Sequence, residues 1–361
     1  MLSAFRDRLV TRPGFRAWAA RFRPTRGIAR RRARALFDVC AGFIYSQVLL
    51  ACVQLDVFGR LAKGPMTTAA LAAAVGLEAA AAQRLLAAAG ALRLVERRGV
   101  RWGLGPLGAA MVDNPAVDAM VRHHGALYAD LADPVRLLRE GRGTLAEYWA
   151  YARADAPGGL GGADVAAYSE LMAASQPLVA AEVLDAYDVR RHRVLMDVAG
   201  GDGRFLVAAG RQAPGLQVVL FDLPAVVARA EARFAEAGMS GRAKVVGGDM
   251  FRESLPEGAD LISLVRVVHD HDDGAAMLLL RAARAALAPG GVLLLAEPMA
   301  GAAGAETVGD AYFGMYLLAM GSGRARSARV LCAMLLDAGF RTARVRGTAT
   351  PLQTGLIVAT V

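Results

Sequence analysis

The sequence predicts an α/β protein: a Rossmann-like, mostly parallel sheet with an antiparallel C-terminal edge, preceded by a mainly helical winged-helix domain. Three observations lead to this prediction. Between residues 193 and 222, a buried strand, a glycine turn, a helix and a second strand ending on an acid follow one another. From there to residue 361 strands alternate with helices, and residues 67–104 show a helix-turn-helix pattern followed by a hairpin.

The first strand–turn–helix unit indicates a nucleoside site. Apolar Val194–Val198 runs into Gly200–Gly203, where the missing Cβ atoms let the backbone approach a ligand closely. Asp222 ends the next strand, where a carboxylate can accept hydrogen bonds from a ribose diol. The turn is neither G-x-G-x-x-G nor a P-loop, and Asp197 and Asp202 disfavour a pyrophosphate. A cationic nucleoside without phosphates therefore fits better, and a plain turn without a ligand is the alternative.

The later strands of the predicted sheet also end in polar residues. They are Lys244–Val246 before Asp249 and Met250, Leu261–Val268 before His269, and the strand VLLLAE, which ends on Glu297. Because the carboxyl ends of parallel strands meet at one edge of a sheet, we expect these side chains to lie together there. The remaining pattern predicts a helix over 274–287 capped by Asp273, helices at 311–320 and 327–338, and closing strands at 342–346 and 355–361.

Size and composition favour a globular protein of two domains. The chain has 361 residues, 55% of them hydrophobic. Its three cysteines lie scattered in apolar segments and predict reduced core residues rather than disulfides. The five histidines show no metal-ligand spacing, so we expect no metal.

Residues 1–34 form a basic N-terminal arm. They hold eleven arginines and one acid, a net charge of +10, which leaves −1 for the rest of a chain whose total is +9. Such an arm binds nucleic acid, attracts anionic lipid, or is a solvated tail. No apolar segment of a secretory signal follows its first charges.

The uncharged stretch from Val39 to Leu55 predicts a buried helix. It is shorter than the roughly 20 apolar residues of a spanning helix and contains Ser46 and Gln47. A helix that is apolar on nearly every face packs inside a domain or a subunit interface, and we favour the interface.

The winged-helix pattern raises the alternative of a DNA-binding regulator. Thr67 or Thr68 caps a helix through Ala74, a second helix covers 78–89, and a hairpin turns at Gly99. The face that would enter a major groove offers only three polar residues, Glu78, Gln83 and Arg84. Readers of bases and phosphates need more donors, so we expect no nucleic-acid partner.

Residues 115–187 predict helices that lead to the first strand of the sheet. The segment Tyr168–Gln176 leads through a helix at about 177–187 to the first strand and should lie over the mouth of the sheet. Tyr168, Met172 and Ser175 are therefore candidates for a substrate pocket. An ordinary amphipathic connector is the alternative for each of them.

His269 is the candidate general base. It is the only group among those strand ends whose ordinary pKa lies near neutrality. A base needs a carboxylate to orient its second nitrogen, and Glu297, one strand over, is placed for this. We expect Asp270 to point elsewhere and His271 to be structural.

The motifs together resemble one enzyme family. GGDG, FDLP, GGDMF, RVVHDHDD, LAPGGVLLLAEP and the C-terminal AGF are similar to the S-adenosylmethionine-dependent small-molecule O-methyltransferases of the plant caffeate/hydroxyindole type. The resemblance covers nearly the whole chain. Within the family, RRRARALFDVCAGFIYSQVLLACVQLDVF and DAYFGMYLLAMGSGRARSA resemble a bacterial branch that methylates hydroxycarotenoids.

This resemblance implies S-adenosylmethionine as co-substrate, no metal, and His269 as the base. The residues that it implies at the cofactor are Asp197, Gly200, Gly201, Asp222, Asp249, Met250 and Arg266. It also implies a basic arm (1–34), a winged-helix dimerisation domain (35–112), a helical linker with the substrate-pocket segment (113–190) and a catalytic domain (191–361). Three residues depart from the family pattern and weaken the roles that it implies nearby. Ala199 stands where the family has a glycine, His271 where it has a tryptophan, and Ala325 where it has a second orienting glutamate.

The expected function is methyl transfer to the tertiary 1-hydroxyl of an acyclic carotenoid. A bacteriochlorophyllide or phenolic acceptor is the alternative within the family. The expected partners are a lipophilic substrate, a second copy of the chain, and a membrane surface contacted by the basic arm. The expected location is cytoplasmic, with peripheral contact to the inner or an intracytoplasmic membrane.

Overall fold

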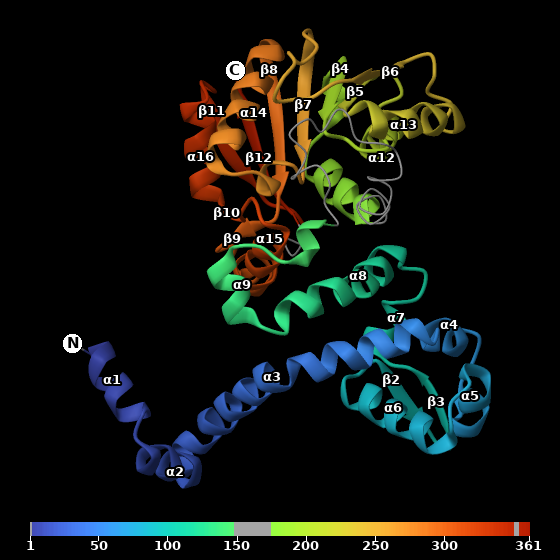
Figure 1. Cartoon of the computed structure of the whole chain (residues 1–361), viewed down its shortest axis with the longest axis vertical. Coiled ribbons are helices and arrows are strands. Elements are labelled where there is room, and N and C mark those ends of the chain that lie inside the picture. The colour runs from blue at the N-terminus through green and yellow to red at the C-terminus, as the bar shows by residue number, and fades with distance from the viewer. Residues whose placement is uncertain (1, 148–174, 350–353) are drawn as a thin grey trace. The chain divides into compact units, whose positions relative to one another are not determined.

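The computed structural model describes residues 2–147, 175–349 and 354–361. The chain divides into two compact units, residues 1–114 and 115–361, and each is described by itself. Figure 1 labels most helices and strands of both units.

The basic arm is helical. α1 (Leu2–Val10) and α2 (Pro13–Arg21) are short, and Pro13 occupies the first turn of α2, where its missing N–H needs no partner. α3 (Arg23–Gln54) continues the arm into the apolar stretch as one helix of 32 residues. The arginines of the arm therefore lie on helices and are mostly exposed, which is compatible with each of the three functions considered for the arm.

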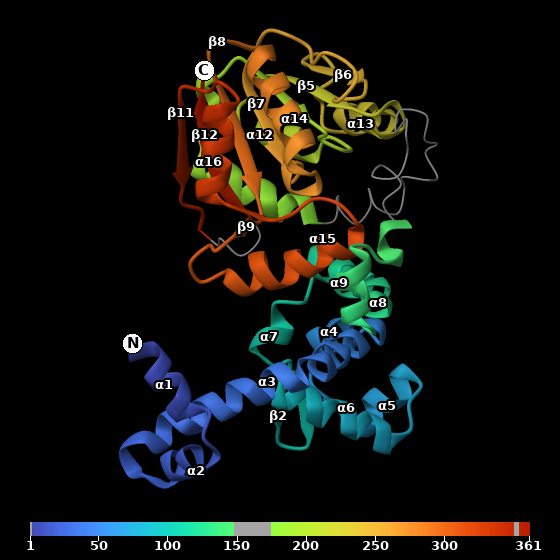
Figure 2. The ribbon, with the colours of Figure 1, turned by 60° about the vertical axis from the view of Figure 1, so that its left-hand side comes forward.

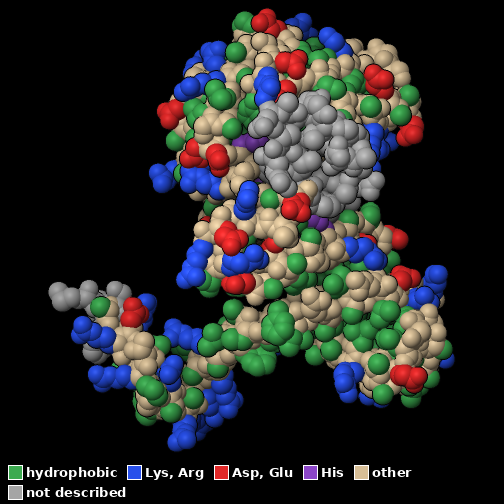
Figure 3. All heavy atoms as spheres, in the orientation of Figure 1, with side chains coloured by type: hydrophobic (Ala, Val, Ile, Leu, Met, Phe, Trp, Pro, Cys, Tyr) green, Lys and Arg blue, Asp and Glu red, His purple; other side chains and the backbone are tan. Residues whose placement is uncertain are grey.

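Most of α3 is exposed within its own unit. Its buried residues are Ala41, Cys52 and Val53, whereas Val39 is 80% and Phe43 65% exposed. Figure 3 shows arginines gathered around α2 and the start of α3, and apolar side chains further along the helix. By length and composition, α3 is also the one helix in the described part of the chain that could span a membrane.

The rest of the first unit has the expected winged-helix arrangement. α5 (Thr68–Val75) begins at Thr67, whose side chain accepts the Ala70 N–H, and ends at Gly76 with a positive φ of 70°. The other elements are α4 (Val57–Ala62), α6 (Ala79–Ala91), α7 (Pro106–Ala109) and a sheet in the order β1 (Met66–Thr67), β3 (Arg101–Leu104), β2 (Val95–Arg98).

The second unit is built on a seven-stranded sheet in the order β11-β12-β8-β7-β4-β5-β6. Its strands are β4 (Val194–Val198), β5 (Gln217–Asp222), β6 (Ala243–Gly247), β7 (Ala259–Val265), β8 (Leu287–Glu297), β11 (Thr342–Arg346) and β12 (Gly355–Thr360). β4 to β8 pair in parallel, whereas β12 runs antiparallel to both β8 and β11. This is the predicted parallel sheet with an antiparallel edge, and β4 is the switch point at which the strand order reverses.

Helices cover both faces of this sheet (Figures 1 and 2). α14 (Asp273–Ala286) and α16 (Ala328–Asp337) pack on one face through residues such as Leu279 and Leu335. α12 (Arg204–Gln212), α13 (Pro224–Glu236) and the helical residues 175–186 contribute to the core on the other. Strands buried on both faces read as continuous apolar runs, which is why the sequence pattern predicted them well.

Further helices precede the sheet or lie in the chain between its strands β8 and β11. They are α8 (Pro115–Leu131), α9 (Pro134–Glu140), η1 (Thr144–Glu147), η3 (Val189–Arg191), the π-helical η5 (Thr307–Phe313) and α15 (Gly314–Met320), with a short parallel pair β9 (Met299–Ala300) and β10 (Arg326–Ser327).

Two local expectations are wrong. β7 ends at Val265, three residues before the predicted end, because Arg266 has a positive φ of 59° and turns the chain out of the strand. Asp273 does not cap α14, since it lies inside the first turn and its carboxylate binds Arg324 and Arg326 instead.

Candidate active site

His269 lies in a tight turn at the carboxyl end of β7. The turn is η4 (Val268–Asp270), one winding of 3-10 helix that begins three residues after the strand. The Arg266 N–H donates to the Ala296 carbonyl at 2.7 Å and holds the start of the turn against β8. His269 is buried, with 5% of its surface exposed.

Glu297 binds the donor side of this turn. One carboxylate oxygen accepts the N–H groups of Val267 at 3.0 Å and Val268 at 2.7 Å, and the other accepts the His269 N–H at 3.4 Å. The second oxygen also lies 2.5 Å from His269 Nδ1. Glu297 therefore orients the imidazole as expected, and it also stabilises the backbone that carries it, which sequence reasoning missed.

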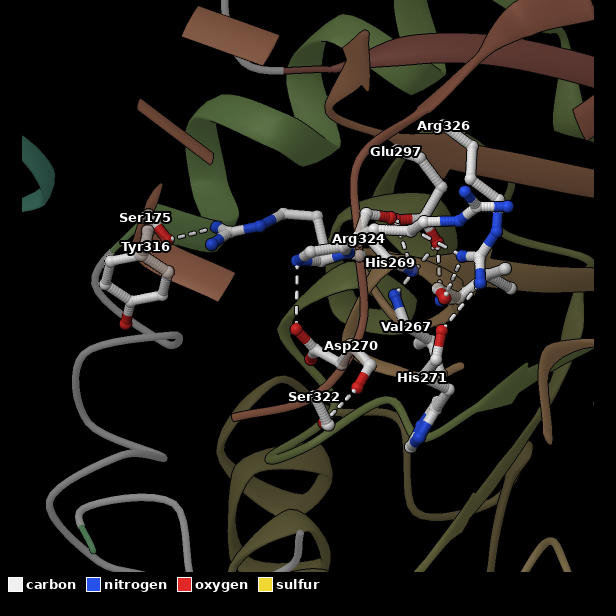
Figure 4. A network of polar contacts seen from close by, with 12 residues as sticks. Ser175, Val267, His269, Asp270, His271, Glu297, Tyr316, Ser322, Arg324 and Arg326 are labelled. Atoms are coloured by element: carbon white, nitrogen blue, oxygen red, sulfur yellow. Dashed lines mark hydrogen bonds and ion pairs between the residues drawn. The ribbon is translucent and has the colours of Figure 1, made fainter. Parts of the chain in front are cut away.

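The acceptor side of the turn is bound by the segment 322–326 (Figure 4). We call this set of donors, the Ser322 hydroxyl, the Arg324 N–H and the Arg326 guanidinium, the carbonyl clamp. They bind four consecutive carbonyl oxygens, those of Val268 (Arg326, 2.9 Å), His269 (Arg324 N–H, 2.8 Å), Asp270 (Ser322, 2.8 Å) and His271 (Arg326, 2.7 Å). Every carbonyl of the turn is thus fixed by residues more than 50 positions further along the chain.

The prediction that Asp270 points away from His269 is wrong. Instead of pointing elsewhere, its Oδ1 lies 3.1 Å from His269 Nε2, so the imidazole stands between two carboxylates. Burial alone would lower the pKa of His269, but the charges of Asp270 and Glu297 outweigh it and raise this pKa. Although Ala325 lacks the family's second glutamate, His269 does contact a second carboxylate, from Asp270.

The glycine turn after β4 brings together the residues expected at the cofactor. Asp197 is buried, and its Oδ1 accepts the Ser263 hydroxyl at 2.6 Å. A Cβ at Gly200 would lie 2.4 Å from Asp197 Oδ2, so only glycine fits there. The Gly201 N–H donates to Asp222 Oδ2 at 2.7 Å, which ties the turn to the end of β5.

The electrostatics of this turn fit a cationic ligand. Burial raises the pKa of Asp197 to about 7 and that of Asp222 to about 6. Asp197 Oδ2 is buried and has no hydrogen-bond partner among the described residues. A ligand that carries an ammonium or sulfonium charge supplies what these carboxylates lack, and S-adenosylmethionine has both.

The other expected cofactor residues lie on neighbouring strand ends. Asp249 follows β6, and the Gly248 N–H just before it donates to the Asp222 carbonyl at 2.9 Å. The Asp249 carboxylate accepts the Phe251 N–H at 2.9 Å. Met250 packs against the apolar core, and the His271 ring stands edge-on to Phe251 at 4.9 Å.

Arg266 links two groups of predicted residues. Its guanidinium donates to the Ser175 hydroxyl at 2.7 Å, so a residue expected at the substrate meets one expected at the cofactor. Tyr168 and Met172 lie outside the described residues. Ala199 adopts a positive φ of 55°, a left-handed conformation that glycine takes without strain, which explains why the family pattern has glycine there.

Sequence reasoning also missed an aromatic cluster beside His269. The Phe313 ring stands edge-on to the His269 imidazole with 5.9 Å between ring centroids. Two histidines of α8, His123 and His124, meet tyrosines of α15 and η5. The segment containing these aromatics carried the family resemblance, but nothing local in it indicated which distant histidines it would contact.

The parallel sheet with acids at its switch point and the histidine between two carboxylates define a class of enzyme. Comparison with known proteins identifies that class. Residues 128–341 match the family model described as an O-methyltransferase domain, and residues 37–114 match an O-methyltransferase dimerisation domain. The chain belongs to this family and is an S-adenosylmethionine-dependent O-methyltransferase. The dimerisation match accounts for the winged-helix pattern and supports a homodimer.

Individual relatives make the resemblance more specific. The chain is 44% identical to demethylspheroidene O-methyltransferase of Cereibacter sphaeroides over 95% of this chain and 91% of the relative. It is 34% identical to acetylserotonin O-methyltransferase of Mus musculus over 87% of this chain and 85% of the relative. Among solved structures, CalO1, a methyltransferase in calicheamicin biosynthesis with SAH bound, superposes with a TM-score of 0.75 at 29% identity, covering 91% of this chain and 98% of that one. Human N-acetylserotonin methyltransferase in complex with SAM gives 0.74 at 28% identity, covering 91% and 97%.

Proposed function

We propose that this enzyme transfers the methyl group of S-adenosylmethionine to the tertiary hydroxyl of an acyclic hydroxycarotenoid. The observation that carries the proposal is the 44% identity, over 95% of the chain, to a demethylspheroidene O-methyltransferase. The aromatic surroundings of His269 support it, since they suit an uncharged, lipophilic acceptor.

His269 is the base in this proposal. Bound S-adenosylmethionine supplies an electrophilic methyl group on a sulfonium, and the acceptor oxygen forms the new C–O bond as the C–S bond breaks. A tertiary alcohol is far too basic to be deprotonated beforehand by an imidazole, so the proton passes to Nε2 as the methyl transfers. Glu297 on Nδ1 stabilises the imidazolium that results.

The Asp270 contact bears on this step. Asp270 Oδ1 occupies the Nε2 side of the ring at 3.1 Å, where the acceptor hydroxyl must come. The hydroxyl either displaces this carboxylate or binds beside it. In both cases Asp270 offers a second site for the proton, and most of the rate then comes from the proximity and orientation of acceptor and methyl group.

The residues assigned to the cofactor follow from the same proposal. Asp197 and the Gly200–Gly201 turn hold the amino-acid part, Asp222 the ribose, and Asp249 with Met250 the adenine. Arg266 lies near the cofactor, between the base and Ser175 at the acceptor pocket.

We further propose that the helical arm attaches the enzyme to an anionic membrane surface, at the cytoplasmic side of the inner or an intracytoplasmic membrane. Trp18 and Phe22 stack with 4.8 Å between centroids and are 50% and 44% exposed. Ile28, six residues further along the chain and on α3, is 47% exposed, and arginines flank all three in the sequence. Aromatic and aliphatic side chains flanked by cations are typical of helices that lie in a membrane interface, where a lipophilic acceptor would be found.

A labelled-methyl assay tests the substrate proposal. Labelled S-adenosylmethionine is offered with a 1-hydroxycarotenoid, a bacteriochlorophyllide and a simple phenol, each in detergent micelles. We expect label on the hydroxycarotenoid. Label confined to another acceptor would keep the methyltransferase and overturn the proposed substrate.

A further inference from the structure

A row of aromatic side chains leads away from His269 within the second unit. We call the following five residues the aromatic wall: His123, His124, Tyr312, Phe313 and Tyr316. Phe313 stands edge-on to His269, and Tyr312 stands edge-on to Phe313 with 5.1 Å between centroids. Tyr312 then stacks on Tyr316 at 5.9 Å and 20°. The rings therefore make a continuous surface that begins at the base.

Two paired hydrogen bonds hold this wall together. His123 Nε2 lies 2.9 Å from the Tyr316 hydroxyl, and His124 Nε2 lies 2.9 Å from the Tyr312 hydroxyl. Each pair joins α8 to the segment formed by η5 and α15. The hydroxyl and imidazole groups thus bind one another, so these four polar atoms need no hydrogen bond from a ligand.

The wall carries no formal charge at neutral pH. Burial lowers the pKa of His123 to about 4 and also lowers that of His124. Burial raises the pKa of the Tyr312 phenol to about 12. An anionic acceptor would find no countercharge among these five side chains.

The wall is not simply the interior of the helical layer. His123, His124, Tyr312 and Phe313 are only half-buried, whereas Tyr316 at the far end of the row belongs to a buried apolar cluster with Leu127 and Leu317. η5 is π-helical, a rare geometry that is frequently found at functional sites. Its last two residues are Tyr312 and Phe313, so the unusual turn positions the rings nearest to the base.

We propose that the aromatic wall is the subsite for the conjugated hydrocarbon chain of the acceptor. The inference rests on the proposed function and deepens it, because it names the residues that distinguish a linear polyene alcohol from a short alcohol. A polyene is long, flat, uncharged and without hydrogen-bonding groups, so it gains most from contact with ring faces whose polar atoms are already satisfied. The terminal hydroxyl then lies at the His269 end of the row.

Two acceptors of different length test this subsite. One is a long polyene with a terminal tertiary alcohol, and the other is a truncated tertiary alcohol with one or two double bonds. Replacing Tyr312→Leu and Phe313→Leu together removes two aromatic contacts and is expected to reduce the preference for the long acceptor, the ratio of the two kcat/KM values, by about 5- to 150-fold. The loss should lie mainly in KM for the long acceptor. The visible absorption band of bound polyene gives a readout independent of turnover and should shift toward its position in detergent.

The Tyr312→Phe variant is the matched control, because it keeps the ring and removes only the hydroxyl. It should retain most of the preference, and cofactor affinity measured by calorimetry shows whether each variant is folded. An unchanged preference and absorption band in the double leucine variant would overturn the subsite while leaving the proposed substrate in place. Failure of the unmodified enzyme to bind or methylate any hydroxylated polyene would instead overturn the proposed function itself.

Discussion

At the scale of single residues, the site works through carboxylates whose surroundings set their charge. Asp197 and Asp222 are buried at the glycine turn, and burial raises the pKa of each. Asp270 and Glu297 face the two nitrogens of His269 and raise its pKa. In the proposed function, the first pair binds the cationic cofactor, and the second stabilises His269 once it holds the proton.

Cofactor affinity should therefore depend on pH. A cationic ligand favours the ionised form of Asp197, whose pKa without ligand is about 7, so below this pH binding must release a proton. Affinity should rise from pH 6 to pH 7 and level off above it. Calorimetric titration with S-adenosylmethionine checks this, and Asp197→Asn should weaken binding at pH 8 by roughly tenfold and flatten the dependence. A variant that kept the same pH dependence would show that another group is responsible.

Asp270→Asn should move the acid limb of the pH–rate profile. The negative charge of Asp270 raises the pKa of His269, and a base must be unprotonated to act, so activity rises as pH increases through this pKa. Removing the charge lowers the pKa, and the limb should shift to lower pH. The profile of kcat/KM over pH 5–9 measures it. An unshifted limb would mean that Asp270 does not act on His269 in the working enzyme.

At the scale of elements, the turn that presents His269 is bound from both sides by distant segments. Glu297 accepts its N–H groups, and the carbonyl clamp donates to its carbonyls. Arg326 contributes two of the four clamp bonds and is only 3% exposed. A buried guanidinium that binds main-chain carbonyls fixes their positions through its planar, rigid geometry.

Arg326→Lys should reduce kcat about 10- to 100-fold, because an ammonium cannot reach both carbonyls and the imidazole loses its position. Arg324→Gln is the matched control, since its N–H still binds the His269 carbonyl while its guanidinium binds only the exposed side of Asp273. We expect a loss of less than about threefold there. Steady-state kinetics and S-adenosylmethionine affinity distinguish the cases. Similar losses in both variants would contradict the positioning role of Arg326.

The strand ends could be predicted from sequence, whereas the contacts between distant segments could not. Asp197, Asp222 and Glu297 follow apolar runs directly, so local pattern was enough to place them at one edge of the sheet. The contact of Asp270 with His269 depends on a 3-10 turn that replaces the last residues of the predicted strand. The carbonyl clamp and the pairs of the aromatic wall join residues 50 to 200 positions apart, and no local periodicity encodes such contacts.

At the scale of the whole molecule, the chain joins a catalytic unit to a unit whose long helix exposes apolar residues and arginines. The match of residues 37–114 to a dimerisation domain supports a homodimer, and we propose that exposed apolar side chains of α3, such as Phe43, meet the second copy. The arginines and aromatics before residue 34 lie outside that match. The membrane contact proposed above involves these residues.

Binding to anionic vesicles should depend on the arm. Replacing Arg30, Arg31 and Arg32 by glutamine should weaken binding to vesicles with 30% phosphatidylglycerol by roughly 100-fold, since each arginine contributes about 1 kcal/mol. Sedimentation with vesicles at two salt concentrations measures it. The same exchange at Arg97 and Arg98, in the hairpin of the first unit, should have little effect. Equal effects of the two exchanges would mean that the arm acts only through its positive charge, and would contradict a specific membrane contact by the arm.

The single-turnover rate of methyl transfer in His269→Ala is the most direct test of the account. The variant is mixed with bound S-adenosylmethionine and a hydroxycarotenoid, and cofactor affinity is measured in parallel. We expect the rate to fall by at least 100-fold, the usual contribution of a general base, while cofactor affinity stays within about twofold. A rate close to that of the unmodified enzyme, with cofactor bound, would contradict the assignment of His269 as the base.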